Sequence, residues 1–278
     1  MATLAKFAKL DPSLAIASLF RPITRGRRPK AFEMTTENDG LTLCWRSFEH
    51  LDSRDQSVLY ACAALALLEE NGNLTADADG PIGKQLWLDL DPAERAVKDS
   101  AVAYDTSYYK ILEAAGMDSV SMRSYDQLKA ILDRLSDVSI RAQKDGYDWK
   151  MRLISYAAKP DGRVSIALNA RMAAALAGQH VKVNLEERRT LGNNDTEHIA
   201  HGWLSAWLRP GKTAVIGIDK LALRVWGTDS AKDATVRKRR ERTIKALERI
   251  GGLAGWRVKI DGKGKDSRAT ISRPSLIE

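Results

Sequence analysis

Tyrosine side chains are the first residues in this chain whose chemical type could support a covalent reaction. Tyr104, Tyr108 and Tyr109 lie together in the segment YDTSYYK, and a tyrosine hydroxyl can serve as a nucleophile, as in enzymes that nick DNA. Such enzymes also need a metal ion to polarise the phosphate. None of the four histidines lies in the His-hydrophobic-His pattern that commonly holds that ion. We therefore interpret the tyrosines as core residues and predict no catalytic residue.

Two further patterns resemble ligand sites. His198 and His201 have helical i, i+3 spacing but no nearby cysteine, so we interpret them as ordinary helix residues rather than metal ligands. The segment Gly211-Lys212-Thr213 resembles a phosphate-binding loop, but that motif needs a glycine five positions earlier, where Ala206 stands. The segment is therefore predicted to be a turn between a helix and a strand. The sequence predicts no metal and no cofactor.

A basic segment near the C-terminal end has the strongest chemical character. TVRKRRERTIKALERIGG, residues 235–252, contains seven Lys and Arg side chains. At about 100° per residue, a helix places four of them on one face: Lys238, Arg242, Lys245 and Arg249. Four aliphatic residues gather on the opposite face: Val236, Ile244, Leu247 and Ile250. We expect Val236, Ile244 and Leu247 to be buried. We predict Ser230 as the N-cap, with Asp233 in the capping-box position, and Gly251-Gly252 as the end of the helix.

The two strands that follow this helix carry more positive charge. Hydrophobic residues alternate with Arg257 and Lys259, and the hairpin tip DGKGKDSR is basic. The major groove of DNA accepts one α-helix while a neighbouring hairpin reaches the backbone, and the N-terminal part of such a helix reads the bases. We predict that the lysines and the hairpin mainly hold phosphate. The predicted DNA-binding residues are Arg237, Lys238, Arg239, Arg242, Lys245, Arg249, Arg257, Lys259, Lys263, Lys265 and Arg268.

Other partners for a basic helix have to be weighed against DNA. A run of charge is often only a solvated face, and a basic amphipathic helix can also lie on a membrane or bind an acidic protein. The apolar face of this helix lacks large aromatic residues, and strands follow it directly. We therefore favour double-stranded DNA and predict no membrane partner.

The overall composition agrees with an acidic partner. The chain has 278 residues and a formal net charge of +8, which favours association with nucleic acid. Between Ala231 and Arg273 there are fourteen Lys and Arg but only five Asp and Glu, so nearly all the excess charge lies in one C-terminal segment. Two cysteines outside any CxxC pattern indicate a cytoplasmic protein without a disulfide framework.

The first half of the chain has a recognisable order of elements. An apolar-basic arm is followed by a hairpin, FEMTT and LTLCW, joined by ENDG. Helices are predicted from Ser53 to a C-cap at Asn71-Gly72, over about 92–115 with Gly116 as its end, and from Ser124. A polar loop is expected over 73–81. The segments VSIRAQ, WKMRLISY and RVSIALN then predict one small antiparallel sheet.

The second half repeats this order without visible sequence identity. We expect a helix over 170–177, the strand HVKVNL, a helix near 195–208, the strand TAVIGI, a short helix capped by Asp219, the basic helix and two last strands. Helices followed by a hairpin are typical of a winged helix. The predicted fold is α+β, with two winged-helix domains in tandem. The predicted boundaries are 1–50 for the arm and hairpin, 51–170 for the N-terminal domain and 171–278 for the C-terminal DNA-binding domain.

Several stretches, taken in order, resemble RepC-type replication initiators of IncQ-like broad-host-range plasmids. The resemblance covers most of the chain, is most specific in the last third, and is least secure over Asp77 to Tyr109. Its segments are SLFRPITRGRRPK, VSIRAQ, GRVSIALN, GQHVKVNLEERRTL, GWLSAWLRPGKT, VWGTDSAKDATVRKRRERTIKALERI and ISRP.

The resemblance implies a protein that works without an active site. Initiators of this type bind repeated origin sequences called iterons, and the C-terminal winged helix contributes most of the sequence reading. Binding to adjacent repeats helps to open A·T-rich DNA so that a plasmid-encoded helicase and a primase can be loaded. Dimerisation through the N-terminal domain is known in similar initiators, so a homodimer stays open here. The alternative from another class is a tandem winged-helix transcriptional regulator, which would bind a single palindrome instead of direct repeats.

Overall fold

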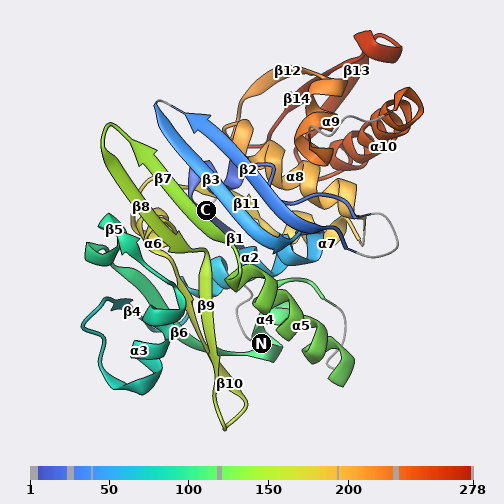
Figure 1. Cartoon of the computed structure of the whole chain (residues 1–278). Helices are drawn as coiled ribbons and strands as arrows, with labels where there is room; N and C mark the ends of the chain where they lie inside the picture. The colour runs from blue at the N-terminus through green and yellow to red at the C-terminus, as the bar shows by residue number, and fades with distance from the viewer. Residues whose placement is uncertain are drawn as a thin grey trace.

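The computed structural model describes residues 6–23, 28–38, 40–117, 121–192, 194–227 and 232–276. Within these ranges the chain is a mixed α/β structure with ten α-helices and four antiparallel sheets around one continuous hydrophobic core (Figure 1). None of the described helices combines the length and the apolar composition that a membrane span needs. The predicted combination of helices with antiparallel hairpins is confirmed.

The predicted N-terminal hairpin forms the edge of a five-stranded sheet. Strands β2 (Lys30–Asn38) and β3 (Leu41–Glu49) pair antiparallel, and the sheet continues through β7 (Ser139–Lys144) and β8 (Tyr147–Arg152) to the two-residue β5. Along β3, buried side chains alternate with more exposed ones, the period of two that lets one face of a strand pack on a core.

Helix α2 (Ser53–Leu65) begins as predicted but ends earlier. Asp52 and Asp55 form a reciprocal capping box at its start, and nearly every residue of the helix is buried. The C-cap predicted at Asn71-Gly72 is wrong, because the helix stops at Leu65 and residues 71–74 form strand β4 (Asn71–Leu74). The polar loop expected over 73–81 is correspondingly shorter, since helix α3 (Gly80–Asp89) follows.

The long helix predicted over 92–115 is wrong for most of its length. This segment forms β5 (Ala93–Glu94), a 3₁₀ turn (Arg95–Lys98, η1) and strand β6 (Ala101–Ser107). Only α4 (Tyr108–Ala114) is helical. Strand β6 lies between β4 and β10 and alternates in burial. Pairing with segments distant in sequence therefore decides its conformation, which local helical spacing could not reveal.

The three strands predicted after this region belong to two sheets rather than one. The segment WKMRLISY divides at Leu153: β8 stays in the five-stranded sheet, whereas β9 (Ile154–Ala158) pairs with β10 (Arg163–Leu168) in a four-stranded sheet of order β4-β6-β10-β9. The preceding helix, α5 (Met122–Ser136), starts two residues before the predicted Ser124, because Ser121 is its N-cap. Its buried face carries Leu128, Ile131, Leu132 and Leu135, while Tyr125 is half-buried.

The N-terminal arm is part of the core. Strand β1 (Phe7–Leu10) pairs with β11 (Val181–Asn184), and a short helix, α1 (Pro12–Ile16), follows it. Leu10 and Leu19 are fully buried. The β1–β11 pairing joins segments on both sides of residue 170, and the domain boundaries given above stay predictions.

The C-terminal part contains the helices and strands of greatest functional interest. After α6 (Ala170–Ala177) and β11 come α7 (Leu185–Thr190), which the sequence did not predict, and α8 (Asp195–Trp207). A three-stranded sheet of order β12-β14-β13 combines β12 (Thr213–Gly217), β13 (Arg257–Asp261) and β14 (Arg268–Ser272). Helices α9 (Ile218–Trp226) and α10 (Asp233–Gly251) lie beside this sheet, at the opposite end of the molecule from α3 (Figure 1).

Candidate nucleic-acid interface

The basic segment forms the predicted helix. Helix α10 runs from Asp233 to Gly251, and Lys232 stands at its N-cap without a side-chain hydrogen bond to the helix. Ser230, predicted as the N-cap, lies outside the described residues, and Asp233 is the first helical residue rather than the third position of a capping box. The helix ends at Gly252, as the Gly-Gly pair predicted.

One side of α10 packs against α8, α9 and β13. Leu247 and Ile250 are fully buried, together with Thr243 and Ala246. Val236 and Ile244, predicted to be buried, are only half-buried, because they lie at the start and at the edge of the packed face. The amphipathic prediction is confirmed for the C-terminal two turns of the buried side and is weaker toward the N-terminus.

The opposite side of α10 presents the predicted basic stripe to solvent. Lys238, Arg242, Lys245 and Arg249 are all exposed. Arg249 also donates a hydrogen bond to the carbonyl oxygen of Thr190 at 3.1 Å, which anchors the end of the stripe to α7. No described carboxylate forms an ion pair with the four side chains of this stripe, so their charge is available to an external anion.

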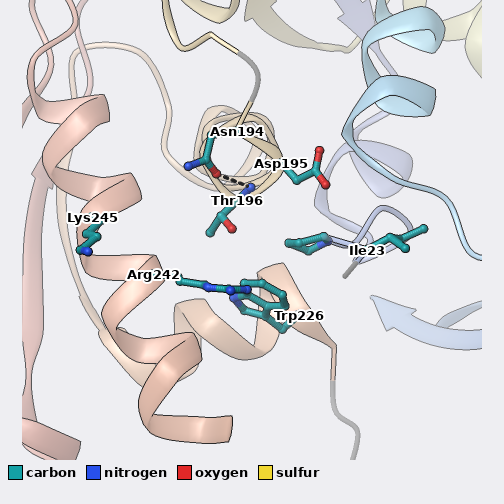
Figure 2. A pocket seen from close by; sticks show the side chains of 8 residues that line it. Ile23, Asn194, Asp195, Thr196, Trp226, Arg242 and Lys245 are labelled. Carbon is teal, nitrogen blue, oxygen red and sulfur yellow. Dashed lines mark hydrogen bonds between the residues drawn. The ribbon is translucent and has the colours of Figure 1, made fainter. Parts of the chain in front are cut away.

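Two arginines of α10 lie over one aromatic ring. The guanidinium carbons of Arg239 and Arg242 are 5.5 Å and 5.6 Å from the centroid of the ring of Trp226, the last residue of α9. Figure 2 shows Arg242 beside this ring. Arg242 is exposed, whereas Arg239 is half-buried. Of the predicted DNA-binding residues of α10, Arg239 is thus the least accessible.

Arg240 has a different role, which the sequence analysis missed. Its Nε and Nη2 atoms each donate to one carboxylate oxygen of Asp219 at 2.7 Å. Asp219 was predicted to cap α9, but Gly217 stands at the N-cap and Asp219 lies in the first turn. On a helical wheel, Arg240 lies close to Val236 and Leu247, on the packed side of the helix. This position could have distinguished Arg240 from the exposed stripe in the sequence.

The hairpin after α10 also places its basic side chains in solvent. Trp256 is buried, and Val258 and Ile260 of β13 are half-buried. At the tip, Gly262 has φ +81°, and a Cβ there would lie 2.8 Å from the carbonyl oxygen of Asp266, so the turn needs glycine. Five predicted residues are exposed along the hairpin: Arg257, Lys259, Lys263, Lys265 and Arg268. Lys259 also pairs with Asp261 at 3.1 Å.

The tip of the hairpin meets α9 at a groove of about 940 Å³. Lys265 and Arg268 line this groove together with Lys220 and Arg224 of α9. The sequence analysis did not select Lys220 and Arg224, because each is an isolated cation in an otherwise apolar segment. Both lie beside the basic tip of the hairpin, in a groove that also contains Glu37, Asp219 and Asp266.

Buried hydrogen bonds fix the hairpin to the helices. Glu187 of α7 accepts from His201 Nε2 at 2.8 Å and from Trp256 Nε1 at 2.9 Å. Burial alone would raise the pKa of Glu187, but these hydrogen bonds and the nearby charges outweigh burial and lower it. Arg273, at the end of β14, donates to the carbonyl oxygens of Leu208 at 2.8 Å and Lys182 at 2.6 Å. Burial lowers its pKa to about 10, so it stays protonated.

The tyrosines and the Gly211-Lys212-Thr213 segment, which we did not interpret as functional sites, can be located in the fold. Tyr104 is buried, and its hydroxyl donates to the carbonyl oxygen of Cys62 at 2.7 Å, as expected of a core residue. Tyr108 is half-buried, while Tyr109 is exposed, so the core interpretation is wrong for Tyr109. Gly211, with φ +73°, lies in the predicted turn between α8 and β12.

Comparison with solved structures identifies proteins with a similar fold. The structure is similar to a selenomethionine derivative of domains 2 and 3 of RctB, with a TM-score of 0.56 and 12% identity over 96% of this chain and 99% of the other. A second structure of RctB domains 2–3 gives a TM-score of 0.53 and 12% identity over 95% and 97% of the two chains. The chain therefore has the predicted winged-helix-like α+β fold.

Comparison of sequences identifies the family. No curated protein sequence matches the chain. The model of the family Replication protein C (RepC) matches residues 4–275, which is almost the whole chain. The stretches that resembled RepC-type initiators therefore reflect true kinship: this chain belongs to the Replication protein C (RepC) family.

Proposed function

We propose that this protein initiates plasmid replication by binding double-stranded DNA at the repeated sequences of an origin, and that α10 and the β13–β14 hairpin make the principal contacts. In this proposal Arg237, Lys238, Arg239 and Arg242 face base edges in the major groove. Lys245 and Arg249 hold phosphates, and so do the exposed hairpin residues Arg257, Lys259, Lys263, Lys265 and Arg268. Membership of the RepC family supports the role in replication.

One observation carries the proposal more than any other. The stripe of Lys238, Arg242, Lys245 and Arg249 is exposed, lies on a single face of α10, and has no ion-paired carboxylate among the described residues. A helix is the element that the major groove accommodates, and unpaired cations are what the phosphate backbone attracts. The basic hairpin beside it supplies the second element of a winged-helix contact.

The proposed mechanism needs binding free energy rather than a chemical step. Several copies on adjacent repeats would bend the duplex, and a bend costs on the order of 1–6 kcal/mol per site, which additional contacts can offset. The strain would favour opening of a neighbouring A·T-rich tract. A plasmid-encoded helicase and a primase would then be loaded on the exposed strands.

The decisive experiment measures sequence preference. Fluorescence anisotropy should give tighter binding to a duplex carrying the direct repeats from the plasmid that encodes the protein than to a shuffled duplex of the same composition. A base-resolution footprint should repeat with the period of those repeats. Equal affinity for both duplexes would remove the proposal, whereas preference for a single palindrome would favour the transcriptional regulator.

A second experiment addresses the absence of chemistry. We propose that the protein is not an enzyme, so supercoiled origin DNA incubated with the protein and Mg²⁺ should stay supercoiled. Covalent capture of a cut strand would contradict this, and Tyr109 would be the first tyrosine to replace, since it is 47% exposed whereas Tyr104 is buried.

A further inference from the structure

Trp226 contacts two arginines that the proposed function assigns to base reading. Its ring lies under the guanidinium groups of Arg239 and Arg242, at 5.5 Å and 5.6 Å from the centroid. The two arginines are three positions apart on α10, so they lie on neighbouring turns of the helix and share one ring. The face of an indole ring attracts a cation within about 6 Å, more strongly than other aromatic rings do.

The ring itself is held firmly. Trp226 is 8% exposed. The next residue, Gly227, has φ +83°, and a Cβ there would lie 2.3 Å from the guanidinium carbon of Arg21. The positive φ favours glycine where the chain leaves α9, and the end of the Arg21 side chain lies beside it. Burial in the hydrophobic core therefore holds the indole ring in addition to its contacts with Arg239 and Arg242.

The ring leaves Arg242 accessible. Trp226, Arg242 and Lys245 line a pocket of about 410 Å³ whose opposite wall includes Asn194 and Thr196 at the start of α8 (Figure 2). Arg242 remains exposed although its guanidinium group rests on the ring. Its hydrogen-bond donors therefore keep access to an external acceptor.

Helix α9 supports the arginines of α10 in two distinct ways. Its first turn contributes Asp219, whose carboxylate binds and neutralises Arg240. Its last turn contributes Trp226, whose uncharged ring lies under the guanidinium groups of Arg239 and Arg242. A carboxylate in the place of Trp226 would compete with DNA for both guanidinium groups, whereas an aromatic ring does not.

We propose that Trp226 is a specificity-determining positioning residue: its ring orients Arg239 and Arg242 for bidentate hydrogen bonds to base edges. This inference rests on the proposed function. A long side chain loses rotamer freedom when it binds, and a guanidinium that is already oriented loses less. The advantage applies to bidentate base contacts, which require one orientation, and not to phosphate contacts, which accept many.

The test compares two duplexes and two tryptophans. Trp226→Leu keeps the apolar bulk and removes the ring, and Trp87→Leu makes the same change at a similarly buried tryptophan on the distant α3. Trp226→Leu should weaken binding to the origin repeat about tenfold, as expected when two side chains lose their prior orientation. Binding to random duplex and its salt dependence should stay as in wild type. Trp87→Leu should bind both duplexes like wild type.

A double-mutant cycle with Arg242→Ala separates positioning from folding. If Trp226 acts through the arginines, Trp226→Leu should have much less effect on the origin repeat when Arg242 is already absent. Equal weakening on both duplexes, with effects that simply add in the cycle, would assign Trp226 a purely structural role and overturn the inference. Unchanged binding of Trp226→Leu to both duplexes would overturn it as well.

The result for wild type distinguishes this inference from the proposed function. If wild-type protein shows no preference for the origin repeat, the proposed function fails. If wild type shows the preference and Trp226→Leu keeps it, only the role of Trp226 fails.

Discussion

Helices α5 and α10 are each followed by an antiparallel pair of strands, β7–β8 and β13–β14, but their exposed faces differ. On α5 the exposed charges alternate in sign, with Arg123 and Lys129 beside Asp126 and Asp133. On α10 the stripe is entirely cationic. A face of mixed charge gives little net attraction for a polyanion, whereas the stripe gives much. The difference supports our proposal that α10 makes the principal DNA contacts.

The arginines of the two helices also face different partners. Arg134 of α5 donates from Nε to the buried Asp55 at 2.9 Å, and Arg28 binds the other oxygen of the same carboxylate at 2.9 Å. Arg242 of α10 instead rests on the uncharged ring of Trp226. On α5 the same residue type therefore pairs with a buried carboxylate, whereas on α10 it leaves an exposed guanidinium group.

Removal of Asp55 should have the largest effect. Asp55→Ala leaves Arg28 and Arg134 without their shared carboxylate and should lower the free energy of unfolding by about 3–5 kcal/mol. Urea denaturation followed by circular dichroism measures this change. Asp126→Ala, at an exposed carboxylate of α5, is the matched control and should stay within about 0.5 kcal/mol of wild type. A similarly small effect of Asp55→Ala would mean that water already satisfies the network.

A comparison of Arg242→Ala with Arg134→Ala tests whether the two arginines have separate roles. Arg242→Ala should weaken binding to the origin repeat by about 1–3 kcal/mol and leave stability nearly unchanged. Arg134→Ala should lower stability, since Asp55 then loses a partner, and leave the DNA affinity of the folded protein unchanged. Anisotropy and urea denaturation on both variants give the four values. If each variant changed both quantities to the same degree, the two arginines would not have separate roles.

The junction between the halves should respond to acid. Arg188 donates to Gln56 and Ser57 of α2 at 3.0 Å and to the carbonyl oxygen of His198 at 2.8 Å. Burial, followed by the charge of Arg188, lowers the pKa of His198 to about 3. The unfolded chain therefore takes up a proton below about pH 6.5 that the folded chain refuses, and stability falls as the pH decreases from 6.5 toward 3.

The magnitude of this effect can be measured by substitution. Between pH 7 and pH 5, His198 should reduce the free energy of unfolding by about 2 kcal/mol. His198→Gln should remove that part of the loss, whereas the contribution of His201, whose pKa burial also lowers, should remain. Urea denaturation at pH 7, 6 and 5 gives both curves. Parallel curves for wild type and His198→Gln would show that His198 is solvated.

The parts of the fold that the sequence predicted well are those that local chemistry determines. Helix α10 has an amphipathic period and a Gly-Gly end, and the β2–β3 hairpin has a turn sequence and alternating strands. The segment 92–115 has no such determinant. Residues Ala101–Ser107 accept either conformation, and pairing with β10 and β4 selects the strand.

The candidate site divides in the same way. The exposed stripe follows from 3.6-residue periodicity, so its members could be selected without the structure. The roles of Asp219 and Trp226 depend on how α9 packs against α10, which no local pattern encodes. Only the position of Arg240 on the helical wheel hinted that one basic residue differs from the others.

We expect the smallest effect on DNA affinity at the hairpin tip. A substitution there tests whether the hairpin contacts phosphates rather than bases. Lys265 is exposed, and a flexible ammonium group contributes charge without a fixed orientation. Lys265→Ala should weaken origin and random duplex equally, by less than about 1 kcal/mol, and reduce the slope of log affinity against log salt by about 1. Lys84→Ala, on the distant α3, is the control and should leave the slope unchanged. A loss confined to the origin repeat would instead make the tip a base-reading element, and the readers could then no longer be assigned to α10 alone.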